Sequence, residues 1–144
     1  MAAELGTMKV TEQIDALEAM AIDPVRYLAM PRIVATTLML PILVVYASSI
    51  AIFGSYTVAT VFLDVPSETF LGAFKKSFEV KDVIAGTIKA LFFGVSISSI
   101  GCFIGFQTSG GAEGVGLSTI KAFVIAAASI LVLDYILWNF LIGM

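Results

Sequence analysis

Long stretches of apolar residues dominate the hydrophobic pattern of this sequence. Residues 33–63 carry no charged side chain, residues 83–112 are interrupted only by Lys89, and residues 122–144 only by Asp134. About 20 apolar residues suffice for a helix to cross the hydrocarbon of a bilayer. The pattern therefore predicts an all-α integral membrane protein with three transmembrane helices, at residues 33–63, 83–106 and 119–142.

The segments between the blocks predict how the spans are joined. Pro41 lies inside the first block and predicts a kinked helix there. The polar loop at residues 64–82 predicts a short surface helix from Ser67 to Phe78, with Ser67 as its N-cap. The glycine-rich stretch before the third block predicts a tight turn, with Ser118 and Thr119 capping the last span.

An acidic, amphipathic segment precedes the first span. At about 100° per residue, its apolar side chains form one stripe and its carboxylates gather on the opposite half, which predicts a helix at residues 4–22. The stripe consists of Val10, Ile14, Leu17 and Ala21, and the carboxylates are Glu12, Asp15 and Glu18. Asp23-Pro24 predicts a new helix start, and Pro31 predicts another.

Two interpretations of this acidic helix are open. It could rest on the membrane surface, although interfacial helices normally present Lys and Arg to anionic lipid. Alternatively, its acidic face could bind a basic groove on a protein partner.

Composition narrows the classes of function. The 144 residues are 59% hydrophobic and 13% charged, with a mean hydropathy of +1.02, as expected in a membrane. The sequence has no histidine, a single cysteine (Cys102) and a net charge of −3, which disfavours metal sites, redox chemistry and nucleic-acid binding. No grouped nucleophile and base, and no GxxxxGK[ST] phosphate loop, is found, so an enzyme is disfavoured. The first residues do not have the pattern of a signal peptide.

Small residues recur along one side of the second span, where they allow close helix packing. Gly101 and Gly105 form a GxxxG motif, and the candidate packing residues are Gly94, Ser98, Gly101 and Gly105. The motif fits packing within one subunit or the seam of a homodimer, and both interpretations stay open.

The two charges inside the spans, Lys89 and Asp134, are expected to form a pair. Helical rise places Lys89 about 10 Å into its span and Asp134 about 24 Å along an antiparallel one, so in a core about 30 Å thick they reach similar depth. Charged atoms within about 4–6 Å are therefore predicted. The alternative for Lys89 is that its long stem carries the ammonium to the membrane surface.

Two stretches of the sequence carry a resemblance. AAELGTMKVTEQIDALEAMAIDPVRYLAMPRIVA, with EQIDA at Glu12 to Ala16, resembles the signature region of the MlaE/YrbE permease family, and IGCFIGFQTSGGAEGVG resembles its later region. These permeases are the membrane subunits of ABC transporters that act on lipids with MCE-domain proteins.

The resemblance implies a multi-pass permease in the bacterial inner membrane that functions as a homodimer. Its partners would be an ABC ATPase, which binds ATP and Mg²⁺, and an MCE-domain protein, so this chain itself would need no cofactor. The acidic segment would be a cytoplasmic coupling helix. Its ATPase-contacting residues would be Thr11, Glu12, Gln13, Asp15 and Glu18.

The resemblance also implies a topology and a question of completeness. The N-terminus and the glycine turn would be cytoplasmic, and the loop at residues 64–82 and the C-terminus would lie outside. Only the C-terminal part of the family pattern is covered. The sequence is thus expected to be a fragment, a truncated reading frame or an incomplete permease, and a non-transporting membrane scaffold is the alternative function.

Overall fold

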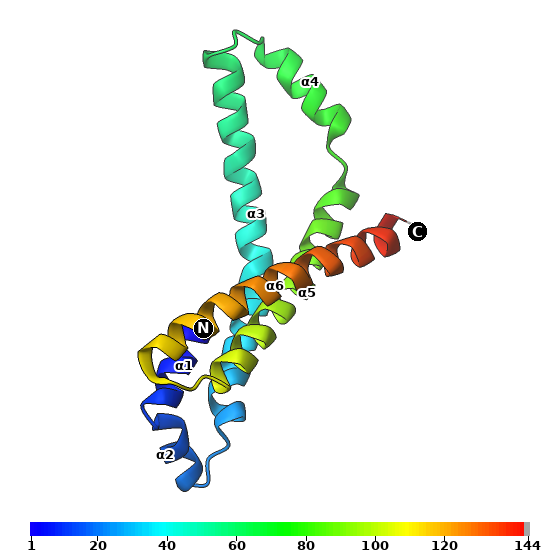
Figure 1. Cartoon of the computed structure of the whole chain (residues 1–144). Coiled ribbons are helices and arrows are strands. Elements are labelled where there is room, and N and C mark those ends of the chain that lie inside the picture. The colour runs from blue at the N-terminus through cyan, green and yellow to red at the C-terminus, as the bar shows by residue number, and fades with distance from the viewer. Residues whose placement is uncertain (143–144) are drawn as a thin grey trace.

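The computed structural model describes residues 1–142, and the side chains of residues 1–140. The described residues form helices and connecting loops without a strand, which confirms the all-α prediction (Figure 1). In chain order the elements are α1 (Ala2–Val10), α2 (Gln13–Ala19), the π-helical η1 (Val25–Ala29), α3 (Met30–Val61), α4 (Ser67–Ser77), α5 (Val80–Phe106) and α6 (Gly111–Ile142).

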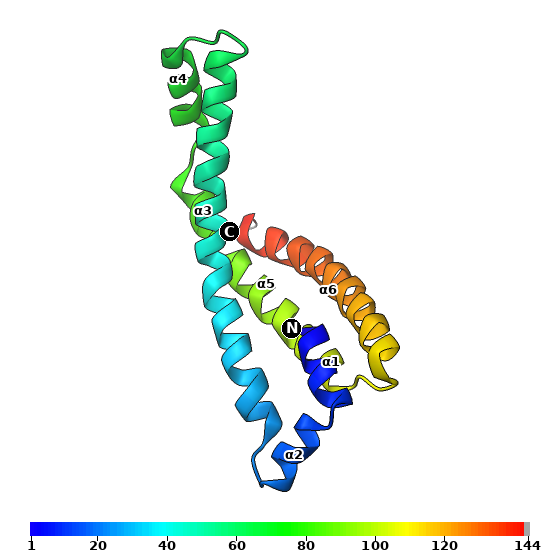
Figure 2. The same ribbon diagram turned by 90° about the vertical axis from the view of Figure 1, so that its left-hand side faces the viewer.

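Three helical segments are long and apolar enough to cross a membrane, as predicted. They are Val25–Val61, Val80–Phe106 and Gly111–Phe140. The helix α5 packs against both α3 and α6 and so lies at the centre of the three (Figure 2). Towards α4, by contrast, α3 and α5 diverge, and α4 connects their separated ends (Figure 1).

The first helix, α1, packs against α5 and α6. Leu5 is completely buried and shares an apolar cluster with Ala29 and Cys102. Ala2 joins a second cluster with Ile104 and Ala122. Because these contacts reach all three spans, α1 is an integral part of the helix bundle.

The acidic segment does not form the single helix predicted at residues 4–22. It breaks between α1 and α2 at Thr11 and Glu12, a break that we call the elbow. Glu12 has a φ of 59°, a left-handed conformation that costs a non-glycine residue about 1–2 kcal/mol. At the end of α1, the carbonyl of Thr7 accepts both the backbone N–H of Thr11 at 3.0 Å and the Thr11 hydroxyl at 2.9 Å.

The second helix ends in a similar way. Ala21 has a φ of 58°, and its N–H donates to the Glu18 carbonyl while the N–H of Ile22 reaches the Leu17 carbonyl. This pair of bonds is the Schellman motif, in which the residue with the left-handed conformation is usually glycine. Asp23 then caps the next helix as predicted, since its carboxylate accepts from the N–H of Val25 at 3.0 Å.

Pro31 does not start a separate helix, contrary to the prediction. The helix continues from Pro24 through the π-helical η1 into α3, so the first span begins at Val25 rather than at residue 33. Proline lacks an N–H and would leave a carbonyl without its α-helical donor. The wider π turn precedes it, where the N–H of Met30 donates to the Val25 carbonyl.

The last span also begins earlier than the predicted residue 119. Gly110 and Gly111, with φ values of 91° and 68°, make the turn, and α6 starts at Gly111. Ser118 and Thr119 therefore lie inside the helix instead of capping it, and the Thr119 hydroxyl donates to the Val115 carbonyl. Gly114 is needed as well, because an added methyl group there would overlap the backbone oxygen of Ser109.

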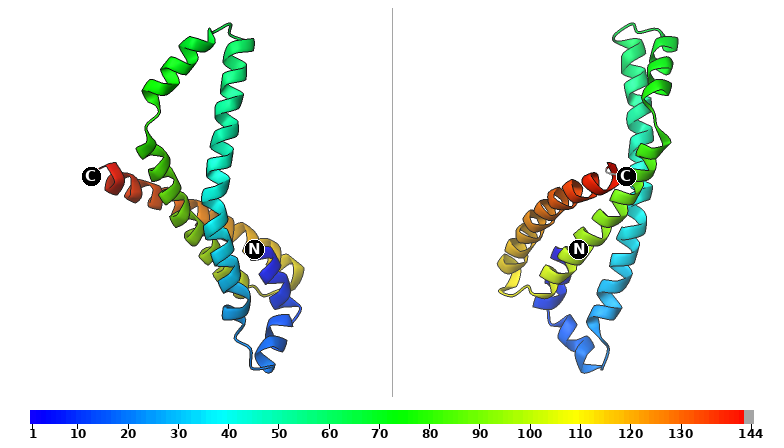
Figure 3. Two further views of the ribbon diagram at one scale, coloured as in Figure 1. Left: turned by 180° about the vertical axis from the view of Figure 1, so that it is seen from behind. Right: turned by 90° about the vertical axis from the view of Figure 1, so that its right-hand side faces the viewer.

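The surface helix α4 lies close to its predicted bounds. It ends at Ser77, one residue before the predicted Phe78, and Pro66 rather than Ser67 occupies its N-cap. In two further views, α4 lies at the end of the molecule opposite to α2 and the turn between α5 and α6 (Figure 3). The placement of the two loops on opposite sides of a membrane stays a prediction.

Candidate functional site

The predicted ATPase-contacting residues are brought together at the tip of the molecule that carries α2 (Figure 1). All five are exposed, and they lie at the elbow and along α2. They are Thr11, Glu12, Gln13, Asp15 and Glu18. On the opposite side of α2, Ile14 is buried and Leu17 is half-buried, so the helix packs its apolar side on its own chain. Its acidic side is left free to contact another protein.

One member of this acidic face has a partner within the chain. The Lys9 ammonium lies 2.6 Å from a carboxylate oxygen of Asp15. This hydrogen bond, together with the attraction of the carboxylate, raises the pKa of Lys9 above its ordinary value, so the lysine stays protonated. In a continuous helix, residues six apart are rotated by about 240° from each other and lie on different faces. The elbow brings them together, and for this reason the sequence did not reveal the pair.

A second ion pair that the sequence did not reveal holds α1 in place. The Arg32 guanidinium on α3 lies 2.8 Å from the Glu4 carboxylate on α1. These residues are far apart in the sequence and have no helical spacing, so no periodicity could have suggested the contact. The pair fixes the N-terminal helix to the first span.

The two intramembrane charges meet between α5 and α6. The Lys89 ammonium lies 2.9 Å from an oxygen of Asp134, which confirms the predicted approach within about 4–6 Å. The Lys89 side chain is only 16% exposed and points into the protein instead of reaching for the membrane surface. Its ammonium also lies 4.9 Å from the ring centre of Trp138, a cation–π contact that was not predicted from the sequence.

The small residues of α5 contact other helices of the same chain. A methyl group added at Gly94 would lie 2.9 Å from the backbone of Thr37 on α3, and one added at Gly105 would lie 2.7 Å from the Leu5 side chain on α1. Ser98 is buried and donates to the Gly94 carbonyl, and Gly101 faces Met1. These contacts favour packing within one subunit, and a role in a homodimer stays a prediction.

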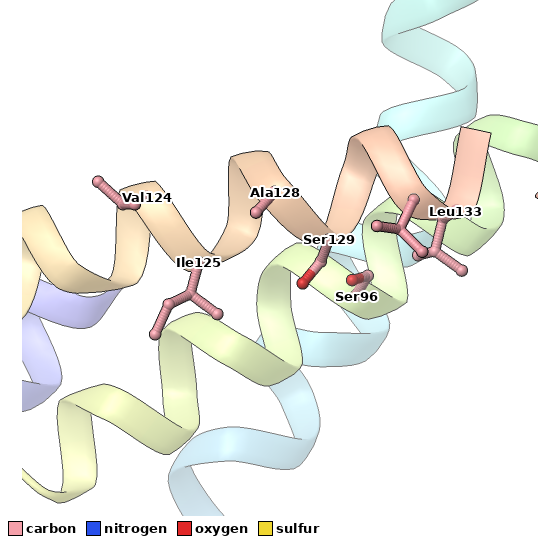
Figure 4. Close-up of a pocket in the computed structure, with 7 residues that line it drawn as sticks. Ser96, Val124, Ile125, Ala128, Ser129 and Leu133 are labelled. Atoms are coloured by element: carbon pink, nitrogen blue, oxygen red, sulfur yellow. The ribbon is translucent and has the colours of Figure 1, made fainter. Parts of the chain in front are cut away.

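Apolar grooves open between the spans. One of about 530 Å³ lies between α5 and α6, lined by aliphatic side chains and two serines, Ser96 and Ser129, that occupy the same stretch of it (Figure 4). A second, of about 380 Å³, lies between α3 and α5, where Ser48, Ser49 and Thr87 add hydroxyl groups and Asp82 a carboxylate. The sequence alone assigned no residue to contact with a substrate.

Comparison with known proteins identifies the family. Residues 1–140 match the family described as Permease MlaE. The chain belongs to the MlaE permease family. This membership confirms the resemblance found in the sequence, and the match extends over α1, the elbow and all three spans.

Individual relatives are similar over nearly the whole chain. A probable ABC transporter permease protein of Rickettsia typhi is 40% identical over 98% of this chain and 54% of its own length. One of Synechocystis is 40% identical over 94% of this chain and 52% of its own length. The chloroplastic protein trigalactosyldiacylglycerol 1 of Arabidopsis thaliana is 35% identical over 96% of this chain and 40% of its own length. This MlaE-family chain thus spans about half the length of the curated relatives it matches, or less.

Proposed function

We propose that this chain forms part of the permease subunit of an ABC transporter, and that α2 and the elbow dock onto the ATPase subunit. The observation that carries the proposal is the exposed acidic face at the tip, on a segment continuous with α1. Since α1 packs against α5 and α6, a push on α2 would be passed to two spans as a rigid-body movement. ATP and Mg²⁺ would be bound, and ATP hydrolysed, on the partner.

Charge reversal on this face tests the docking. We expect Glu12→Lys with Asp15→Lys to abolish copurification of the ATPase, because the sign reversal adds repulsion to lost attraction, and Ala at both positions should have a smaller effect. The matched control is Glu68→Lys with Glu79→Lys, which makes the same change of charge near α4, at the opposite end. Full retention of the ATPase by the first variant would contradict the proposal.

The substrate class that we propose is a membrane lipid. The groove between α5 and α6 is lined by aliphatic side chains and serine hydroxyls, which suits acyl chains better than a charged solute. One relative, the Arabidopsis protein, also has a galactolipid in its name. We further propose an MCE-domain protein as partner, a homodimeric permease and the bacterial inner membrane as its location.

Reconstitution separates transport from a scaffold function. The complex of the permease, the ATPase and the MCE-domain protein should move labelled phospholipid between vesicles only when ATP is supplied. ATPase binding without any nucleotide-dependent lipid movement would favour the non-transporting scaffold instead.

A further inference from the structure

The two sides of the elbow differ in how firmly they are held. On one side, α1 is fixed by the buried Leu5 and by the Glu4–Arg32 ion pair. Gly6 also packs closely on Thr108, because a methyl group added at Gly6 would lie 3.0 Å from the Thr108 hydroxyl. On the other side, α2 has only seven residues, of which Ile14 alone is buried. The direction in which α2 points therefore depends on the elbow.

The Lys9–Asp15 ion pair spans this elbow. Lys9 belongs to α1 and Asp15 to α2, and among the described residues no other ion pair joins α2 to the rest of the chain. Both side chains are partly exposed, so the pair adds little to folding stability. The Lys9–Asp15 pair can, however, favour one angle between α1 and α2.

We propose that Asp15 is a positioning residue: through Lys9 it holds α2 at the angle at which Glu12 and Glu18 meet the ATPase. This inference rests on the proposed docking function. An arginine or lysine of a partner that approached Asp15 would meet the Lys9 ammonium at the same carboxylate and be repelled by it. Glu12 and Glu18 are exposed and have no ion-pair partner within the described part of the chain.

A charge swap distinguishes positioning from direct contact. In the intact permease, Asp15→Lys and Lys9→Glu should each lower the amount of copurifying ATPase about three- to tenfold, since each puts like charges across the elbow. Lys9→Glu combined with Asp15→Lys restores opposite charges and should recover retention to within about twofold of the wild type. Asp15→Asn, which only removes the pair, should lower retention less than Asp15→Lys.

Two outcomes would overturn the inference. If the swapped variant retains as little ATPase as Asp15→Lys alone, Asp15 contacts the ATPase directly. If neither single reversal lowers retention, the ion pair has no part in docking. A matched swap, Lys9→Glu with Glu18→Lys, should not recover retention, because Glu18 lies in the proposed contact. Recovery by that control would show a general charge effect and contradict the assignment.

Failure of the docking proposal itself would look different. In that case Glu12→Lys with Glu18→Lys, which leaves the Lys9–Asp15 pair intact, would retain the ATPase as fully as the wild type. All variants should reach the membrane in equal amounts and elute as a single species in detergent, because every altered side chain is at least partly exposed.

Discussion

The molecule contains two regions that are built on different principles. Every buried residue among those described lies in residues 1–41 or 90–122, which we call the packed region. From residue 42 to residue 89, the open region, no residue is buried, although this stretch contains half of a transmembrane helix. The membrane-spanning parts of both regions are strongly apolar, so hydrophobicity alone does not explain why only one of them is packed.

The distance between neighbouring helices explains the difference better. In the packed region, Gly94 and Gly105 let the backbones of α3 and α1 approach α5 closely. In the open region, large side chains such as Tyr46 and Phe53 are about two-thirds exposed, and the helices diverge. Within a bilayer, close packing depends on shape because lipid tails are as apolar as the side chains. The packed region is therefore suited to transmit a force, and the open region to yield.

The largest expected effect concerns the Lys89–Asp134 pair, whose lysine is the last residue of the open region. Lys89→Met or Asp134→Asn alone leaves one polar or charged group without its partner, and each should lower the free energy of unfolding by about 2–3 kcal/mol. Lys89→Met with Asp134→Leu should recover part of the loss. Reversible unfolding by SDS in mixed micelles measures all three. Simple additivity of the two single effects would show that the pair does not couple α5 to α6.

A methyl group should harm the packed region and not the open one. Gly105→Ala places a carbon 2.7 Å from Leu5 and about 3.2 Å from the Ala2 carbonyl, which should cost about 1–2 kcal/mol. Gly86→Ala lies in the open region on the same helix and meets no atom within 4 Å, so it is the matched control and should be neutral or slightly stabilising. Equal thermal stability of the two variants in detergent would remove the distinction between the regions.

A smaller gain is expected at the end of α2. Ala21 has the left-handed conformation that glycine adopts without strain, so Ala21→Gly should stabilise this turn by about 0.5–1 kcal/mol. The gain should appear as slower amide hydrogen exchange in α2 rather than as a large change in melting temperature. The same substitution at Ala19, inside α2, is the control and should speed exchange.

The smallest effect is expected in the open region. Phe70 of α4 meets Tyr56 of α3 edge to face at 5.5 Å, and few other contacts join the two helices. Phe70→Ala should therefore lower the global free energy of unfolding by less than about 0.5 kcal/mol, while proteolysis within residues 64–79 becomes faster. A loss as large as that of Gly105→Ala would show that α4 belongs to the packed region.

The sequence was most informative where length and charge decide the structure. Three spans follow from the long apolar blocks, and the Lys89–Asp134 contact follows from helical rise in a layer of fixed thickness. It was least informative where backbone geometry departs from residue preference. Glu12 and Ala21 adopt conformations that normally require glycine, so neither the elbow nor the end of α2 has a signal in the sequence. Lys9–Asp15 was missed for the same reason, because it exists only once the helix is broken.

The π-helical turn at Val25–Ala29 has a consequence for how the tip is oriented around the axis of the first span. A π turn holds one residue more than an α turn, and one residue corresponds to about 100° of rotation. Because α1 stays packed against α5 and α6, deleting one residue from this turn would rotate the start of the span by about 100° relative to the end of α2 and strain the link between them. The rotation between α2 and the first span is thus set in steps of one residue, so a change of side chain alone cannot adjust it gradually.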